Sequence, residues 1–172
     1  MITRNRPEVN FRAIRDMGLA AWFGGSLMNL AGLVPASESQ PDPVQRHRVY
    51  DAGMRGGRGL LTGSVAAYLV GTGMVRFDGK VMGRNGVPRW VEEGVEDKTR
   101  TALTVVALGS AVVARTLRDR ATKKLDQQGA DGKTLQEVEH LRRSGHVFHA
   151  IVPAAVGALM YSHLKQDMRR RR

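Results

Sequence analysis

The 172-residue chain contains no cysteine and few aromatic residues. The absence of cysteine excludes a disulfide framework, a thiolate metal site and a cysteine nucleophile. Aromatic residues make up only 5% of the chain, which is few for a protein that stacks nucleic-acid bases. Acidic residues are also scarce, since 16 Asp and Glu stand against 27 Lys and Arg. The length fits one ordinary domain, and the net charge of +11 favours an anionic partner.

Formal charge is missing from four long stretches, which are residues 17–37, 59–75, 101–114 and 144–164. A helix needs roughly 20 mostly apolar residues to cross the hydrocarbon core of a bilayer, with about 17 as the lower end. The first and last stretches, of 21 residues each, meet that length, and the second is at the limit. The third is short, but the basic residues that flank it can extend it by snorkelling. The pattern therefore predicts four membrane spans, and the lack of acids inside them argues against a carboxylate-based proton or cation pump.

Turn and capping signals divide the chain into four helices. We expect a flexible basic leader over 1–10, one four-helix membrane domain over 11–168 and a basic tail over 169–172. Helices are predicted over 11–34, 43–75, 96–126 and from 134 onward, with breaks in the second at Gly53, Gly56 or Gly57. Residues 76–88 are rich in turn signals and are predicted to hold a small hairpin. Thr134 and Glu137 predict a capping box. The predicted fold is all-α, an antiparallel four-helix bundle in the membrane with charged helix extensions.

Small residues recur at helical spacing inside the predicted spans. In lipid, helices associate through close backbone approach, which requires Gly, Ala or Ser on the facing side. In water, each glycine inside a helix costs about 1 kcal/mol relative to alanine. The pattern therefore favours membrane packing over the alternative, a soluble bundle with close helix contacts. The predicted packing positions are Gly18, Gly25, Gly32, Gly59, Gly63, Ala67, Gly71, Ala150, Ala154 and Ala158.

Three histidines in the last predicted span are the most suggestive polar groups. His146 and His149 are three residues apart and share a helix face, and His163 returns to a similar face about 21 Å away. Histidines so placed could serve a haem, a quinone or a proton relay. Their spacing matches no zinc motif, and no acid inside the span partners them. Interfacial hydrogen-bonding histidines are the favoured interpretation, with no metal and no bound cofactor.

Basic clusters lie directly beside the apolar stretches. Such clusters neutralise nucleic-acid phosphates or anionic lipid headgroups equally well, and their position favours lipid over nucleic acid. The predicted lipid contacts are Arg115, Arg118, Lys123, Lys124, Arg169, Arg170, Arg171 and Arg172. Neither a phosphate-binding loop nor a Gly-x-Ser-x-Gly elbow nor a His-Glu-x-x-His pair occurs, so we expect no enzymatic activity.

The first apolar stretch contains the run Trp22-Phe23-Gly24-Gly25. This run resembles a signature in the first helix of small uncharacterised four-helix membrane proteins from actinobacteria. The resemblance covers residues 19–28 together with the number of spans. It implies a bacterial integral membrane protein of unknown activity and carries over no catalytic residue.

Three hypotheses follow from these patterns. The first is a multi-pass protein of the cell membrane, with a structural, accessory or interaction role in a homo-oligomer or larger complex. The second is a soluble or peripheral basic helical protein that binds nucleic acid or anionic membrane surfaces. The third is a small-solute transporter, or a haem- or quinone-handling protein that uses the three histidines. No signal peptide is apparent, so the first span is expected to be retained.

Orientation follows from the distribution of Lys and Arg. With four crossings, 15 of them lie on the side of the two termini and 12 on the other side, which predicts cytoplasmic termini. If residues 101–114 do not cross, the division becomes 18 against 9, but the basic tail is then left outside. Four crossings remain the preferred topology.

Overall fold

The computed structural model describes residues 7–78, 95–128 and 131–170, with side chains for 10–75, 98–127, 131–165 and 168. All regular structure in these ranges is helical. The expected hairpin in 76–88 and the outermost residues of the tail, Arg171 and Arg172, lie outside the described residues.

The first helical segment runs without interruption through α1 (Pro7–Met28), η1 (Asn29–Leu33) and α2 (Val34–Glu38). The η1 segment is a π-helical turn, in which the Val34 N–H donates to the carbonyl of Asn29. Pro35 follows directly and has no N–H to donate to the preceding turn, which explains why the widened turn lies here. The segment ends where the Ser37 hydroxyl donates to the Val34 carbonyl and Ser39 N–H donates to the Pro35 carbonyl.

The second segment consists of α3 (Pro43–Gly56) and α4 (Arg58–Asp78). Asp42 caps α3, because its carboxylate accepts from the Val44 N–H at 3.0 Å and Pro43 occupies the first turn. The break predicted at one of three glycines occurs at Gly57.

The third and fourth segments are α6 (Val95–Gln128) and α7 (Gly132–Arg170). The capping box predicted for α7 is wrong in its residues. The Asp131 carboxylate accepts from the Thr134 N–H at 2.8 Å, and Glu137 pairs with Lys124 of α6. Asp131 therefore supplies the cap, since an aspartate caps a helix as well as a threonine does. The same hydrogen bonds from Thr134 hold the pKa of the Asp131 carboxyl below its ordinary value.

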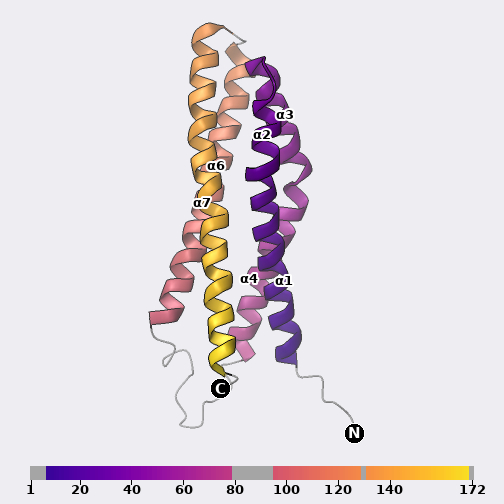
Figure 1. Cartoon of the computed structure of the whole chain (residues 1–172), viewed down its shortest axis with the longest axis vertical. Coiled ribbons are helices and arrows are strands. Elements are labelled where there is room, and N and C mark those ends of the chain that lie inside the picture. The colour runs from indigo at the N-terminus through magenta and orange to yellow at the C-terminus, as the bar shows by residue number, and fades with distance from the viewer. Residues whose placement is uncertain (1–6, 79–94, 129–130, 171–172) are drawn as a thin grey trace.

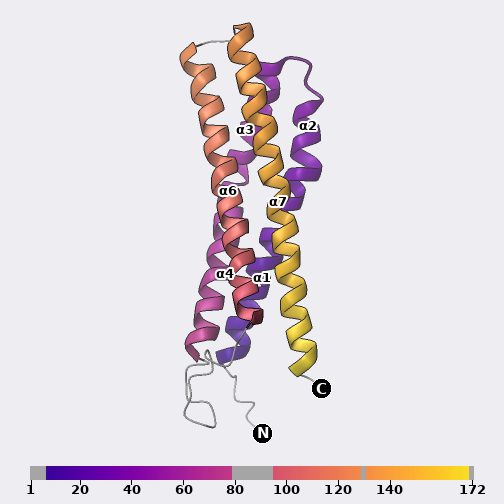
Figure 2. The same ribbon diagram turned by 90° about the vertical axis from the view of Figure 1, so that its left-hand side faces the viewer.

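These segments run alternately up and down one long axis, as Figures 1 and 2 show. The start of α1 and the end of α7 lie at the same end of the molecule. Along their lengths α1 packs against α4, and α6 packs against α7, which also contacts α1. The core between the segments is made of Leu19, Trp22, Tyr68, Ala107, Val152, Ala155, Val156 and Leu159.

One polar pair is enclosed in this core. The Tyr68 hydroxyl lies 3.0 Å from the Thr104 hydroxyl, and the Thr104 hydroxyl donates to the Arg100 carbonyl. Because the single Thr104 proton is used in that way, Tyr68 is the donor between the two hydroxyls. Trp22 packs on Tyr68 with ring centroids 5.9 Å apart, so the pair is satisfied and covered.

Candidate functional site

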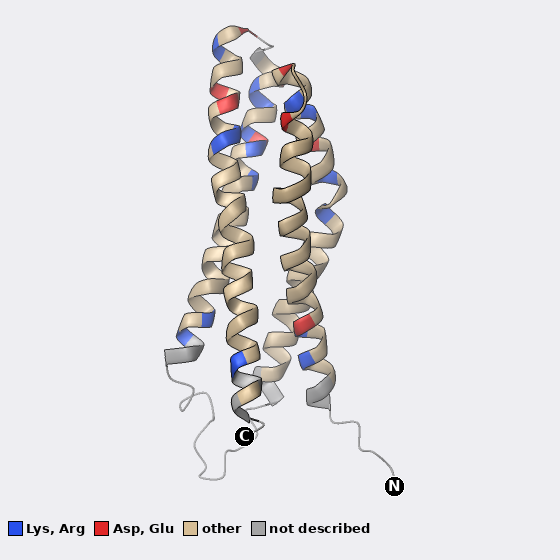
Figure 3. Cartoon of the chain, viewed as in Figure 1, with Lys and Arg blue, Asp and Glu red and all other residues tan. Residues whose placement is uncertain are grey.

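A belt without charge surrounds the middle of the molecule. It consists of residues 17–37, 59–75, 101–114 and 144–164, here called the apolar belt. Figure 3 shows a zone without Lys, Arg, Asp or Glu in the lower middle of the molecule, with charges above and below it, and the upper part of 17–37 lies beside the charged α3. Large apolar side chains point outward from the belt on every segment, and Met17 and Met28 are 72% and 76% exposed. Others are Leu27, Leu60, Leu69, Val70, Val105, Val106, Val112, Val147, Tyr161 and Leu164.

Two of the four stretches that form the belt, 17–37 and 144–164, are as long as a bilayer core is thick, whereas 59–75 and 101–114 are about 26 and 21 Å long. At 1.5 Å per residue, a 21-residue stretch is about 31 Å long, close to the roughly 30 Å of hydrocarbon in a membrane. Exposed apolar surface of this extent is uncommon on a soluble monomer. Three helices of the described residues are long and apolar enough to cross a membrane, Asn10–Glu38, Lys98–Gln127 and Gly132–Lys165. They contain three of the four predicted spans.

The α4 helix, which holds the predicted span 59–75, is not among these three. Its stretch contains four glycines, two threonines and a serine, which lower its average hydropathy. The stretch 101–114, which is short for a span, lies within one of the three helices long and apolar enough to cross a membrane, because α6 continues beyond it at both ends.

A buried polar cluster lies at the edge of the belt and beyond it, at the end opposite to the chain termini. Here α3 packs against the outer parts of α6 and α7. The cluster, called the polar cluster below, comprises His47, Tyr50 and Asp51 of α3, Arg118 and Thr122 of α6, and Arg142, His146 and His149 of α7. A cavity of about 10 Å³ lies within it, large enough for about one water molecule.

Tyr50 brings two of the predicted histidines together. Its ring meets His146 edge-on at 5.1 Å between centroids and His149 at 6.1 Å. Burial raises the pKa of the Tyr50 hydroxyl to about 12, so the phenol stays protonated at neutral pH. His163 does not join them and lies near the other end of α7, buried beside α1 and α6.

His47 forms a hydrogen bond through one of its two ring nitrogens. Its Nε2 lies 3.0 Å from the Thr122 hydroxyl, which donates its only proton to the Arg118 carbonyl. The other ring nitrogen, Nδ1, is buried and has no hydrogen-bond partner among the described residues. Burial lowers the pKa of the imidazole, and the Arg118 and Arg142 charges add to that effect against the opposing carboxylate of Asp51.

Ion pairs at the polar cluster link α3 with α6 and α7 with α2. Arg118 lies 3.4 Å from the Asp51 carboxylate, measured from Nε to Oδ1. Arg142 is almost wholly buried, pairs with Glu38 at the end of α2 and donates to the Glu139 carboxylate at 2.7 and 2.9 Å. The ends of α2, α3, α6 and α7 are thus joined by paired charges rather than by apolar contact alone.

The basic residues predicted to contact lipid differ in their exposure. Arg115 and Lys123 are exposed, and Lys124 pairs with Glu137. The predicted lipid contact of Arg118 is wrong, because its side chain is only 5% exposed and pairs with Asp51 inside the polar cluster. The side chains of Arg169 and Arg170 lie outside the described residues, as do Arg171 and Arg172.

The predicted packing glycines divide into two groups. A Cβ on Gly18 would meet the Tyr68 nitrogen at 2.5 Å and the Ser64 carbonyl oxygen at 2.8 Å, and one on Gly71 would meet the Arg15 nitrogen at 2.6 Å. Both glycines therefore lie where the backbones of α1 and α4 touch, with Ala67 beside them. Gly25 faces Leu61 of α4 at 2.9 Å.

The remaining small residues do not face a neighbouring helix. Gly59 and Gly63 are exposed, with no atom within 4 Å of an added Cβ, and Gly32 is near only Met28 of its own segment. Ala150, Ala154 and Ala158 also lie on the exposed side of α7. A spacing of four advances by about 400° and rotates around the helix by about 40° at each step. The predicted stripes therefore leave the contact face, which in α4 follows Ser64, Ala67, Tyr68 and Gly71.

Sequence reasoning did not single out His47, Asp51 or Arg142 as site residues. A signal for α3 was present, because His47, Tyr50, Asp51 and Met54 follow the helical spacing of a buried face within a charged segment. No group of His, Cys, Asp or Glu in the described residues has the arrangement of a metal site. Comparisons with protein-family models, curated proteins and solved structures each found no match.

Proposed function

We propose that the chain is a multi-pass integral membrane protein, built as an antiparallel four-helix bundle, that serves as a structural, accessory or interaction subunit rather than as an enzyme. The observation that carries the proposal is the exposed apolar belt, whose stretches 17–37 and 144–164 are as long as a bilayer core is thick. A lipid environment accounts for exposed apolar side chains such as Met17, Met28 and Val112, because their exposure to water would be unfavourable in free energy.

A fourth crossing by α4 is supported by the direction of its neighbours. Both α1 and α6 rise along the same axis, so the chain must return between them. It does so through α3 and α4, and α4 packs along the belt portion of α1. Glycines such as Gly71, which lower its hydropathy, are the residues that allow this close packing.

The support for a non-enzymatic role comes from the polar cluster. Its arginines pair with carboxylates of the same region, and its cavity is the size of one water molecule. Small-molecule sites are commonly 300–1,000 Å³. The cluster is therefore suited to holding the helix ends together at and beyond the edge of the bilayer, without a bound haem, quinone or metal.

Partners and orientation complete the proposal. Exposed Ala150, Ala154 and Ala158 leave a face of α7 on which another helix can approach closely, which supports membership in a homo-oligomer or larger complex. The excess of basic residues on the side of the termini supports a cytoplasmic location for both. Lipid, rather than nucleic acid, is the partner of the exposed basic residues next to the belt.

Membrane insertion is tested first by alkaline carbonate extraction of membranes that contain the full chain. An integral protein stays in the pellet. Release of most of the chain without detergent would refute insertion and favour the basic peripheral protein.

A sharper test uses the absence of cysteine in the natural chain. Val112 and Lys123 are both exposed on α6, but Val112 lies in the belt and Lys123 beyond it. In membrane fragments whose two faces are both accessible to the reagent, a water-soluble maleimide should label Lys123→Cys. It should leave Val112→Cys unreacted until SDS dissolves the membrane. In a soluble protein both cysteines would react alike, and that result would contradict the proposal. Val70→Cys tests the crossing by α4 in the same way.

A further inference from the structure

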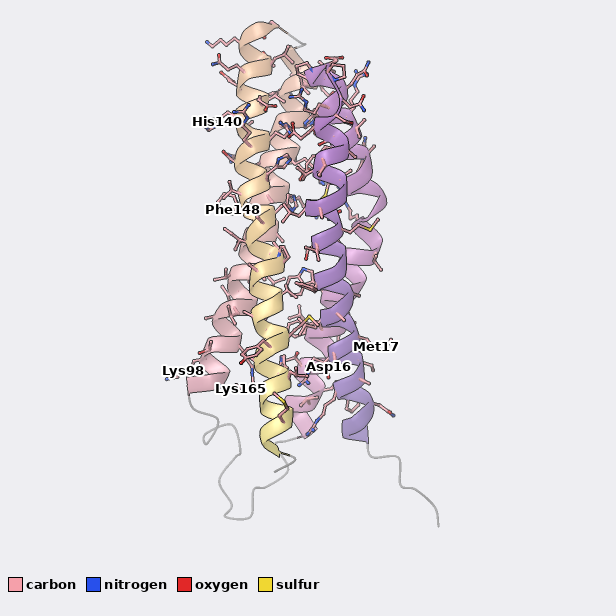
Figure 4. All side chains as sticks on the ribbon, viewed as in Figure 1. Asp16, Met17, Lys98, His140, Phe148 and Lys165 are labelled. Carbon is pink, nitrogen blue, oxygen red and sulfur yellow. The ribbon has the colours of Figure 1, made fainter. Side chains whose placement is uncertain are left out.

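Three nitrogen-rich side chains lie at the same level, where the segments leave the belt on the side of the chain termini. They are Arg15 of α1, Arg100 of α6 and His163 of α7. In Figure 4, Asp16, Lys98 and Lys165 mark the same level along the long axis. This level is here called the terminal boundary.

The Arg15 side chain is buried, and only one of its three guanidinium nitrogens makes a hydrogen bond among the described residues. Its backbone lies against Gly71, and its side chain is 8% exposed. Its Nε donates to the Asp16 carboxylate at 2.8 Å, and among the described residues this is the only hydrogen bond that the guanidinium makes. The two terminal nitrogens therefore remain available for a bidentate acceptor.

His163 is buried at the same level, within reach of the Arg15 charge. The residue is 8% exposed, and neither ring nitrogen has a hydrogen-bond partner among the described residues. The charged groups that act on its ring are Arg15, Arg100 and Asp16. Arg100 is fixed nearby, because its Nε donates to the Ser162 hydroxyl at 3.2 Å and its Nη2 to the Ser162 carbonyl at 3.1 Å. A buried imidazole without partners is costly, and its surroundings are cationic.

We propose that the terminal boundary binds the phosphate of an anionic phospholipid headgroup, with Arg15 and His163 as hydrogen-bond donors and Arg100 as a nearby positive charge. The inference rests on the proposed function, because the acyl chains must lie along the apolar belt. The phosphate of a phospholipid lies at the edge of the hydrocarbon core, which is the level of Arg15. An arginine fork matches two phosphate oxygens, and a neutral imidazole supplies one N–H.

The charge on this side favours an anionic over a zwitterionic lipid. The sequence outside the belt on the side of the termini has 15 Lys and Arg and eight Asp and Glu. Basic groups between helices at the membrane surface are a known means of binding anionic headgroups. A phosphatidylglycerol or a similar phosphodiester lipid is therefore the expected occupant.

The test is native mass spectrometry of the delipidated full chain in detergent, titrated with phosphatidylglycerol and, separately, phosphatidylcholine. The natural chain should retain phosphatidylglycerol preferentially. Arg15→Gln should weaken its binding about fivefold, which corresponds to about 1 kcal/mol for one basic residue at a membrane surface. His163→Gln should weaken it less, and Arg15→Lys should restore part of the loss.

Arg143→Gln is the matched control. Arg143 flanks the other end of the α7 span and is 77% exposed, so its loss should weaken phosphatidylglycerol binding far less than the loss of Arg15. Equal losses in Arg15→Gln and Arg143→Gln would show general charge attraction and overturn the site. Binding of phosphatidylglycerol that Arg15→Gln does not reduce would overturn it as well. Displacement of the lipid by millimolar inorganic phosphate would show a site for the free anion instead.

The same variants separate this inference from the proposed function. If the natural chain is released by carbonate, the proposed function fails. If the chain is retained and Val112→Cys is protected, but no preference for phosphatidylglycerol is found, only the lipid site fails. Arg15→Gln should also unfold cooperatively in lipid-free detergent, which excludes misfolding as the cause of weaker binding.

Discussion

Replacement of Gly18 by alanine tests the contact between α1 and α4. The new Cβ would lie 2.5 Å from the Tyr68 nitrogen and 2.8 Å from the Ser64 carbonyl oxygen, which are backbone atoms and cannot rotate away. Ordinary contact requires roughly 3.5 Å, so the two helices must separate by about 1 Å at this point. A gap of that size removes a quarter to a half of the local dispersion energy, and overpacking commonly costs about 1–3 kcal/mol.

The matched control is Gly24→Ala on the same helix. Gly24 is exposed and has no atom within 4 Å of an added Cβ, so alanine there should leave the stability unchanged or raise it slightly. By thermal unfolding in detergent, Gly18→Ala should melt about 2–12 °C below the natural chain. If both variants melt at or above the temperature of the natural chain, α1 and α4 do not pack as the structure shows.

Two further predictions concern the polar cluster. Because burial lowers the pKa of His47 below 6.5, the unfolded state binds its proton more readily, and stability should fall as pH drops below 6.5, by at most about 1.4 kcal/mol per pH unit for this one group. His47→Gln should reduce that slope in unfolding measurements between pH 7 and 5, and an unchanged slope would show that His47 does not contribute. Arg142→Gln should cost about 2 kcal/mol, because its side chain is buried while its partners Glu38 and Glu139 are partly exposed. Exposed Arg143→Gln should cost less than about 0.5 kcal/mol, and equal losses from both arginines would contradict the assigned burial.

Much of the fold could be predicted because its signals are local. The charge-free stretches, the Asp42-Pro43 start of α3 and the glycines around Gly57 each act within a few residues. These signals locate the helices to within a few residues. The cap of α7 was misassigned because Asp131 and Thr134 are both competent capping residues three positions apart.

The site could be predicted only in part because its contacts are distant in the sequence. Arg142 pairs with Glu38, 104 residues away, and His47 meets Thr122, 75 residues away. Spacing along one helix cannot reveal such partners. For the same reason, the small-residue spacing of α4 identified Gly71 as a contact but misassigned Gly63, whose face depends on where α1 lies.

The outward reach of α6 and α7 has a consequence for recognition. Past the end of the uncharged stretch at Ala114, α6 continues for 14 residues, or about 21 Å. The headgroup layer on one side of a bilayer is only about 5–8 Å deep. In the proposed membrane arrangement, the tip formed by the end of α6 and the start of α7 therefore lies beyond the lipid headgroups, and α3 packs against both helices. A soluble protein or an antibody fragment could bind this tip at Lys123 or Lys133 without contacting the bilayer.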